Sequence, residues 1–194
     1  MMKYSLFLIL FLFISFGVFA QNKYEREHRI LKKQFPKNAL AFVEAKLEGA
    51  KRVRFYRELD SAKTSFEVKF KKDRLHYSVE FDENGNLEDV EITISEIDLP
   101  NESWANIKAY LNKNFKKTKV RKIQQQYTTS GHQTSEETLR NAFQNLLIPS
   151  LNYEIIVAGK KRKNFELFEV LFDASGNFIK IRKSLPANYD HVLY

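Results

Sequence analysis

The chain has 194 residues, and its 32 lysines and arginines outnumber its 24 aspartates and glutamates, giving a formal net charge of +8. It contains no cysteine, which excludes disulfide bonds and the lipid attachment of a bacterial lipoprotein. The basic excess suits an anionic partner, and a net charge of this size is equally ordinary for the surface of a soluble domain.

Residues 1–20 are typical of a cleaved export signal. Lys3 precedes an almost unbroken apolar run over residues 4–16, and small residues follow at 17–20, where a signal peptidase reads the chain. The alternative, a retained membrane anchor, would need a longer run, because a spanning helix takes about 20 apolar residues. The sequence therefore predicts cleavage before Gln21, an exported protein that is periplasmic or secreted, and no membrane span after cleavage.

The next segment carries signals for a strand, a helix and two more strands. Residues 24–31 fit either a helix or a strand, and we favour the strand. Pro36 suits the first turn of a helix, where its missing N–H costs nothing, and apolar residues then recur at helical spacing as far as Leu47. Alternation of apolar and polar residues predicts strands around residues 53–55 and 66–70.

A hairpin pattern then occurs twice in the chain. Residues 77–87 read Tyr-Ser-Val-Glu-Phe-Asp-Glu-Asn-Gly-Asn-Leu, which is a half-buried strand followed by a turn. Gly85 can supply the positive φ that a tight hairpin needs. The same pattern returns at residues 168–178, and short connections of this kind indicate antiparallel pairing.

The second half of the chain resembles the first but contains an insertion. Pro100 opens another helical pattern, and residues 120–123 mark a strand. An extra helix is then expected at about 134–148, where Thr134 and Glu137 form a capping box. The sheet resumes around residues 153–157 and ends near Ile181, and residues 186–194 are expected to form a C-terminal tail.

The two hairpins, each following a proline-started helix, resemble the PepSY-like family of exported bacterial domains, over residues 24–185. That family is also described as similar to β-lactamase-inhibitor protein. The resemblance implies an α+β fold of two tandem repeats, each with one helix plus antiparallel strands, and with the helices on one face of the sheet. The repeats would cover residues 21–99 and 100–185, with the extra helix in the second. It also implies a binding or inhibitory role rather than catalysis.

No pattern of catalytic, metal-binding or cofactor-binding residues was found. The four histidines are scattered without the spacing of a zinc site. Residues 82–86 have a passing likeness to a calcium loop, but they lack its series of alternating oxygen ligands and its final glutamate. Nucleophile-elbow, phosphate-loop and dinucleotide signatures are absent. The sequence predicts a protein that is not an enzyme and uses no cofactor or metal.

The open face of the sheet, turned away from the helices, offers the first candidate site. In the first half this face is polar, with His76, Ser78 and Glu80. In the second half an apolar strip is expected, and its members are the candidate ligand-binding residues Ile156, Phe165, Leu167, Glu169 and Leu171. Such a strip usually has a cover. Either the inserted helix buries it through Leu139, Phe143 and Leu147, or it is a surface for a protein or peptide partner in the cell envelope.

Two lysine-rich runs offer the second candidate, an anion-binding edge made by Lys116, Lys117, Lys119, Arg121, Lys122, Lys160, Lys161, Arg162 and Lys163. No aromatic residues interleave with these charges, so specific nucleic-acid binding is not expected. The runs could instead protect strand edges from aggregation. Two functions follow: an exported binding module that recognises a protein or peptide through the open sheet face, or an electrostatic binder of anionic envelope polymers. Only the second predicts affinity that falls steeply with salt.

Overall fold

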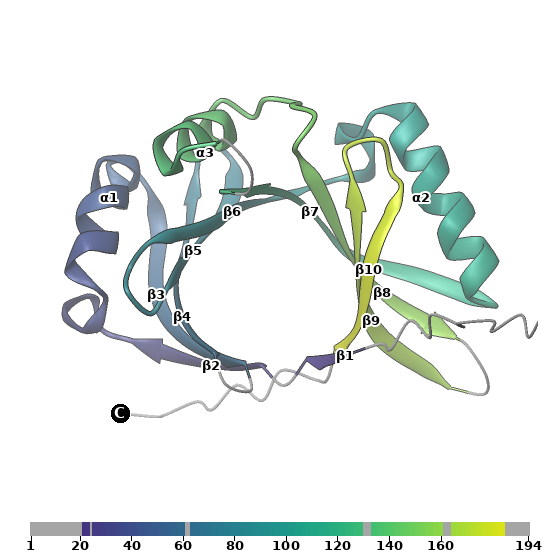
Figure 1. Cartoon of the computed structure of the whole chain (residues 1–194), viewed down its shortest axis with the longest axis horizontal. Coiled ribbons are helices and arrows are strands. Elements are labelled where there is room, and N and C mark those ends of the chain that lie inside the picture. The colour runs from purple at the N-terminus through teal and green to yellow at the C-terminus, as the bar shows by residue number, and fades with distance from the viewer. Residues whose placement is uncertain (1–20, 24, 61–62, 130–132, 161–163, 185–194) are drawn as a thin grey trace, which may run out of the picture.

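The computed structural model describes residues 21–23, 25–60, 63–129, 133–160 and 164–184 (Figure 1). The predicted export signal, the tail at 186–194 and residues 161–163 lie outside these ranges. The described segments form three α-helices, namely α1 (Lys37–Leu47), α2 (Asn101–Asn114) and α3 (Ser135–Phe143). Short 3-10 helices precede the first two, at Lys32–Gln34 and Glu96–Asp98.

Most of the described chain is β-strand. The strands are β1 (Gln21–Lys23), β2 (Glu25–Ile30), β3 (Lys51–Asp60), β4 (Lys63–Lys72), β5 (Leu75–Asp82), β6 (Leu87–Ile94), β7 (Lys117–Thr128), β8 (Asn152–Lys160), β9 (Phe165–Asp173) and β10 (Phe178–Ser184). They form one sheet in the order β1-β10-β9-β8-β7-β6-β5-β4-β3-β2. Strands β2 to β10 pair antiparallel, and β1 pairs parallel with β10.

The two edges of this sheet are consecutive in the chain. Strand β1 ends at Lys23 beside β10, and β2 begins at Glu25 beside β3. Because one residue spans only a few ångströms, the two ends of the sheet must lie close together. The sheet therefore curves into a nearly closed ring, with all three helices on its outer side (Figure 1).

The predicted fold class, two tandem repeats of one helix plus antiparallel strands, is wrong. Strand β6, the last of the first predicted repeat, pairs antiparallel with β7 of the second, from Asp89–Thr128 to Ile94–Ile123. Helix α3 contacts both of these strands. The repeated hairpin pattern specifies two similar turns, but a turn does not decide which strand pairs with the next free edge. The result is a single continuous sheet.

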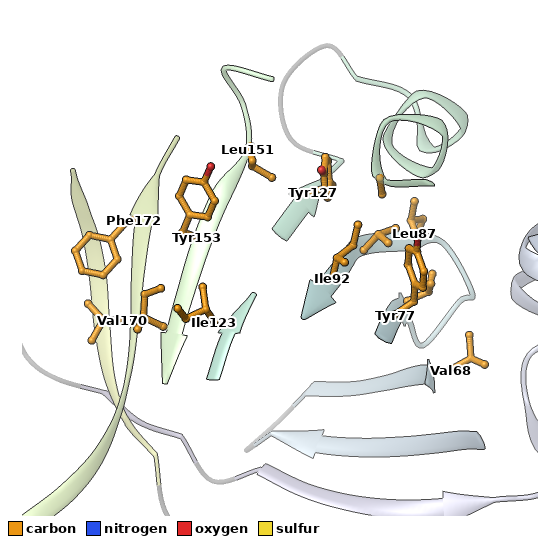
Figure 2. Close-up of a cluster of buried hydrophobic side chains, with 14 of the residues drawn as sticks. Val68, Tyr77, Leu87, Ile92, Ile123, Tyr127, Leu151, Tyr153, Val170 and Phe172 are labelled. Atoms are coloured by element: carbon orange, nitrogen blue, oxygen red, sulfur yellow. The ribbon is translucent and has the colours of Figure 1, made fainter. Parts of the chain in front are cut away.

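The hydrophobic core lies between the sheet and the helices. Strand residues alternate, so that one set, including Val79, Ile92 and Ile155, is fully buried on the helix-covered side. Figure 2 shows Tyr127, Leu87 and other members of this set on the side of the sheet that α3 covers. The opposite set faces the inside of the ring, and we call this inner surface the concave face.

Helices α1 and α2 are fixed to the sheet by the two hairpin turns. The Asn38 side-chain amide donates to the carbonyl of Asn84 at 2.6 Å, and the Ser103 hydroxyl donates to the carbonyl of Ala174 at 2.8 Å. Gly176 has a φ of +82°, and a Cβ at this position would lie 2.3 Å from the carbonyl oxygen of Ser103. Glycine is needed there both for the backbone conformation and for the close approach of α2.

Candidate functional site

The concave face encloses a polar hollow of about 370 Å³, which we call the acidic hollow. Nine of its lining residues are acidic and five are basic, although the chain as a whole carries a net charge of +8. Its acidic members are Glu27, Glu58, Asp60, Glu67, Glu80, Asp89, Glu91, Glu154 and Glu169. Negative charge is therefore concentrated in this part of the concave face.

Three of these carboxylates stand side by side on neighbouring strands. Glu67 of β4 is directly opposite Glu80 of β5, and Glu80 is directly opposite Asp89 of β6. We call Glu67, Glu80 and Asp89 the carboxylate row. Like charges in directly opposed positions of a sheet repel one another, so this arrangement is unfavourable unless protons or cations compensate it.

The pKa values of two members of the row show this repulsion. Burial and the nearby charges of Glu91, Glu80 and Glu67 hold the pKa of Asp89 well above its usual range. The pKa of Glu80 is raised as well, first by burial and then by Glu67 and Glu88, against a lowering hydrogen bond with Ser65. Both carboxyl groups therefore take up protons more readily than free carboxylates.

Glu67 differs because a lysine neutralises it. Lys69 Nζ lies 2.8 Å from Glu67 Oε2 and 2.9 Å from Glu27 Oε1, and the Ser78 hydroxyl donates to Glu67. Burial alone would raise the pKa of Glu67, but the Lys69 charge and hydrogen bonds with Glu58, Lys69 and Ser78 outweigh it and lower the pKa. Burial acts to lower the pKa of Lys69, and the charges of Glu67 and Glu27 raise it overall.

Carboxylate oxygens of Glu27, Glu58 and Glu67 lie within 4.8 Å of one another, which is close enough to share one cation. The Lys69 ammonium group already lies between two of them. A metal ion bound by these oxygens would have to displace this lysine.

The predicted apolar strip is on the concave face but is not continuous. Ile156 and Glu169 line the acidic hollow and lie directly opposite one another, and Arg182 Nε donates to Glu169 at 2.9 Å. Leu171 is only 7% exposed, whereas Phe165, at the end of the strip, is 44% exposed. Leu167 lies half-buried opposite Ala158. Charged residues thus interrupt the apolar ones.

The inserted helix does not cover this strip. The ring of Phe143 in α3 stacks on Tyr77 with 4.7 Å between centroids, on the outer side of the sheet. Leu147 is 59% exposed and follows the end of α3 at Phe143. The alternative in which Leu139, Phe143 and Leu147 bury the strip is therefore wrong, because the helix packs on the outer face, against apolar residues that include Phe70 and Tyr77.

The structure brings the two lysine-rich runs together. Lys117 of β7 lies directly opposite Lys160 of β8, and Lys119 Nζ lies 5.6 Å from the centre of the Phe165 ring. Lys122 faces the acidic hollow. Arg121 is exposed at an irregularity of the β7–β8 pairing, and Lys116 is exposed just before β7. The remaining predicted members, at 161–163, lie outside the described residues.

Sequence reasoning placed His76, Ser78 and Glu80 on the open face, where the structure has them, but missed their neighbours. Glu58, Asp89 and Glu154 were not singled out. Each occupies an inward position of the alternation, so the pattern contained the signal. What the alternation does not contain is the closure of the sheet, which places these residues around one hollow.

No family model and no curated protein matches the chain. Among solved structures, a DUF2874 family protein from Bacteroides ovatus matches with a TM-score of 0.54 and 12% identity, over 82% of this chain and 94% of its own. A protein from Bacteroides eggerthii, named provisionally as periplasmic, matches with a TM-score of 0.54 and 11% identity, over 81% and 93%. A BLIP-like protein from Bacteroides fragilis matches with a TM-score of 0.49 and 12% identity, over 82% of this chain and 92% of its own.

These identities are low, so the first two structures establish a shared fold and nothing more. Neither of their names is the name of an enzyme. Membership of the PepSY-like family stays a prediction. In the described part of the chain, no helix has the length and apolar character needed to span a membrane.

Proposed function

We propose that this protein is an exported, non-catalytic binding module whose concave face receives a basic segment of a protein or peptide partner in the cell envelope. The observation that carries the proposal is the carboxylate row on a sheet face that the three helices leave uncovered. The export signal predicted at residues 1–20 and the periplasmic name of the B. eggerthii structure support the location.

A lysine or arginine side chain of the partner fits this face chemically. It would supply several N–H donors and one positive charge to Glu80 and Asp89, whose ionised forms the folded protein disfavours. Binding would then relieve a repulsion that already exists in the free protein. The half-buried Ile156 of β8 lines the same hollow, two strands away from the strand of Asp89, and would contact an apolar side chain of the same segment.

A displayed library of random peptides tests the proposal. The parent protein should enrich peptides rich in lysine and arginine, and the variant Glu80→Gln, Asp89→Asn should lose this enrichment while remaining folded. The matched control Glu102→Gln, Glu136→Gln removes two exposed carboxylates from α2 and α3 and should enrich the same peptides as the parent. Equal enrichment by all three proteins would contradict the proposal.

A second candidate function, binding of anionic envelope polymers, is supported by the position of Lys117 opposite Lys160. Two like charges held face to face favour a polyanion. Retention on an anionic polysaccharide matrix should then fall steeply with salt and fall further in Lys117→Gln, Lys160→Gln. Retention that the double substitution leaves unchanged would exclude this edge as the polymer site.

A further inference from the structure

A second hollow, of about 470 Å³, adjoins the acidic hollow on the concave face, and Lys69 and Lys122 line both. We call it the basic pocket. Its basic lining residues are Arg52, Arg54, Lys69, Lys71, His76 and Lys122, and no carboxylate is among the residues that line it. Its size is within the range of about 300 to 1,000 Å³ found for small-molecule sites.

The strands β3, β4, β5 and β7 contribute these residues. Arg54 is directly opposite Lys69, and Lys71 is directly opposite His76. These pairs bring Arg54 and Lys71 to the same part of the sheet. The charge of Lys69 is already balanced by Glu67 and Glu27, so an anion bound here would be attracted chiefly by Arg54 and Lys71, together with Arg52 and Lys122.

The cations of the basic pocket also differ from those of the acidic hollow in their partners. In the acidic hollow, Lys63 pairs with Glu88 at 2.7 Å and Arg182 pairs with Glu169. In the basic pocket, Lys69 is paired, but Arg52, Arg54, Lys71 and Lys122 make no ion pair or side-chain hydrogen bond with any residue that the structure describes. Four cationic side chains are thus available to a ligand.

The backbone at Arg52 gives an independent indication. Arg52 has a φ of +59°, in the left-handed region, and lies where the pairing of β3 with β4 shifts register between Lys51 and Arg54. Glycine would adopt this conformation without strain, whereas an arginine there is strained. Bulges of this kind redirect side chains and often occur beside functional sites. Arginine at this position is explained if its guanidinium group is needed in the pocket.

We propose that the basic pocket binds a phosphate group. A phosphate monoester carries nearly two negative charges and three acceptor oxygens, which matches several converging cations better than a single carboxylate does. The planar guanidinium groups of Arg52 and Arg54 suit bidentate contact with such oxygens, and Lys71 and Lys122 add point charges. The pocket shares Lys69 with the carboxylate row, but Arg52, Arg54 and Lys71 do not line the acidic hollow, and this proposal does not depend on the proposed peptide function.

Calorimetric titration of the purified protein with inorganic pyrophosphate at constant ionic strength tests the proposal. The parent should bind, and Arg54→Gln, Lys71→Gln should bind at least about tenfold more weakly, since a lost charge-assisted hydrogen bond weakens binding by about that factor. The matched control Lys37→Gln, Lys113→Gln removes two exposed lysines from α1 and α2 and should keep the parent affinity. Equal weakening in both variants would overturn the proposal.

Arg52→Gly separates a ligand role from a structural one. Because glycine relieves the positive φ, this variant should melt at the same temperature as the parent or higher, yet bind pyrophosphate several-fold more weakly. An unchanged pyrophosphate affinity in this folded variant would contradict the site. The basic peptides selected by the carboxylate row should still bind to it, so failure of one proposal does not imply failure of the other.

Long-chain polyphosphate distinguishes a single phosphate group from a polymer track. If the pocket is the site, Arg54→Gln, Lys71→Gln should weaken the binding of pyrophosphate and polyphosphate alike. If polyphosphate binding instead depends on Lys117 and Lys160 and is insensitive to Arg54 and Lys71, the phosphate site in the basic pocket is refuted.

Discussion

Replacing Asp89 by asparagine removes one charge from the carboxylate row while preserving the shape of the side chain. Glu80 lies directly opposite Asp89, and Gln126 Nε2 donates to Asp89 Oδ2 at 3.0 Å. Asparagine can still accept this hydrogen bond through its amide oxygen. The substitution therefore changes mainly the repulsion between Asp89 and its acidic neighbours.

The size of the effect follows from the geometry. Directly opposed side chains lie about 5 to 6 Å apart, and two unit charges at that distance repel by about 3 kcal/mol at an effective dielectric constant of about 20. Asp89 is half-buried, so water screens part of this repulsion. Exchanging a charged acceptor for a neutral one in the Gln126 hydrogen bond costs about 1 kcal/mol. We expect Asp89→Asn to raise the free energy of unfolding by about 1 to 2 kcal/mol at pH 7.

The pH dependence of folding stability gives an independent argument that Asp89→Asn is stabilising. Because the pKa of Asp89 is higher in the folded than in the unfolded protein, its ionisation destabilises the fold at neutral pH. This penalty disappears as the pH falls through the raised pKa and is gone below the ordinary aspartate pKa of about 3.9. The advantage of Asp89→Asn over the parent should therefore be largest near pH 7 and shrink as the pH falls.

Urea unfolding of Asp89→Asn beside Asp173→Asn provides the assay and its control. Asp173 accepts hydrogen bonds from the backbone N–H groups of Ser175 at 2.9 Å and Asn177 at 2.8 Å. Burial would raise its pKa, but these bonds and the Asn177 side chain lower it, so the same substitution should destabilise there by about 1 kcal/mol. If Asp89→Asn destabilised the protein like Asp173→Asn, the carboxylate row would not be a site of repulsion.

Two further substitutions test the architecture. Gly176→Ala should lower the free energy of unfolding by about 2 to 4 kcal/mol, because it combines a strained positive φ with a clash against the Ser103 carbonyl. Gly49 also has a positive φ, but a Cβ there would meet nothing within 4 Å, so Gly49→Ala should lower it by only about 1 kcal/mol. Equal decreases in urea unfolding would contradict the docking of α2 on this turn. Phe143→Ala removes the ring stacked on Tyr77 and should destabilise by about 2 to 3 kcal/mol. A thermal unfolding midpoint unchanged from the parent would show that α3 does not pack on the outer face.

The local elements could be predicted because their signals lie within a few residues of one another. The capping box of α3 is present, with the N–H of Glu137 donating to the Thr134 hydroxyl at 3.2 Å and the N–H of Thr134 donating to the Glu137 carboxylate at 3.0 Å. The turn after β5 is held as its sequence indicates, because Asp82 accepts bonds from the N–H groups of Asn84 and Asn86.

What could not be predicted depends on pairing between distant segments. The apolar stripe of α3 required an apolar surface, and the sequence does not say which face of the sheet the helix packs on, because α3 contacts β6 and β7, whose pairing joins distant segments. The basic pocket is a similar case. Arg54, Lys71 and Lys122 belong to β3, β4 and β7, and only the register of the five strands from β3 to β7 brings them together.

The central claim is that the concave face, and not the helical side, is the binding surface. A methyl NMR titration of the isoleucine-labelled protein with a short lysine peptide tests it directly, because Ile156 lines the acidic hollow and Ile107 of α2 is fully buried beneath the helices. The account predicts a saturable shift of the Ile156 signal, lost in Glu80→Gln, Asp89→Asn, with the Ile107 signal unmoved. Shifts confined to Ile97, which is exposed beside α2, with Ile156 unchanged, would contradict it.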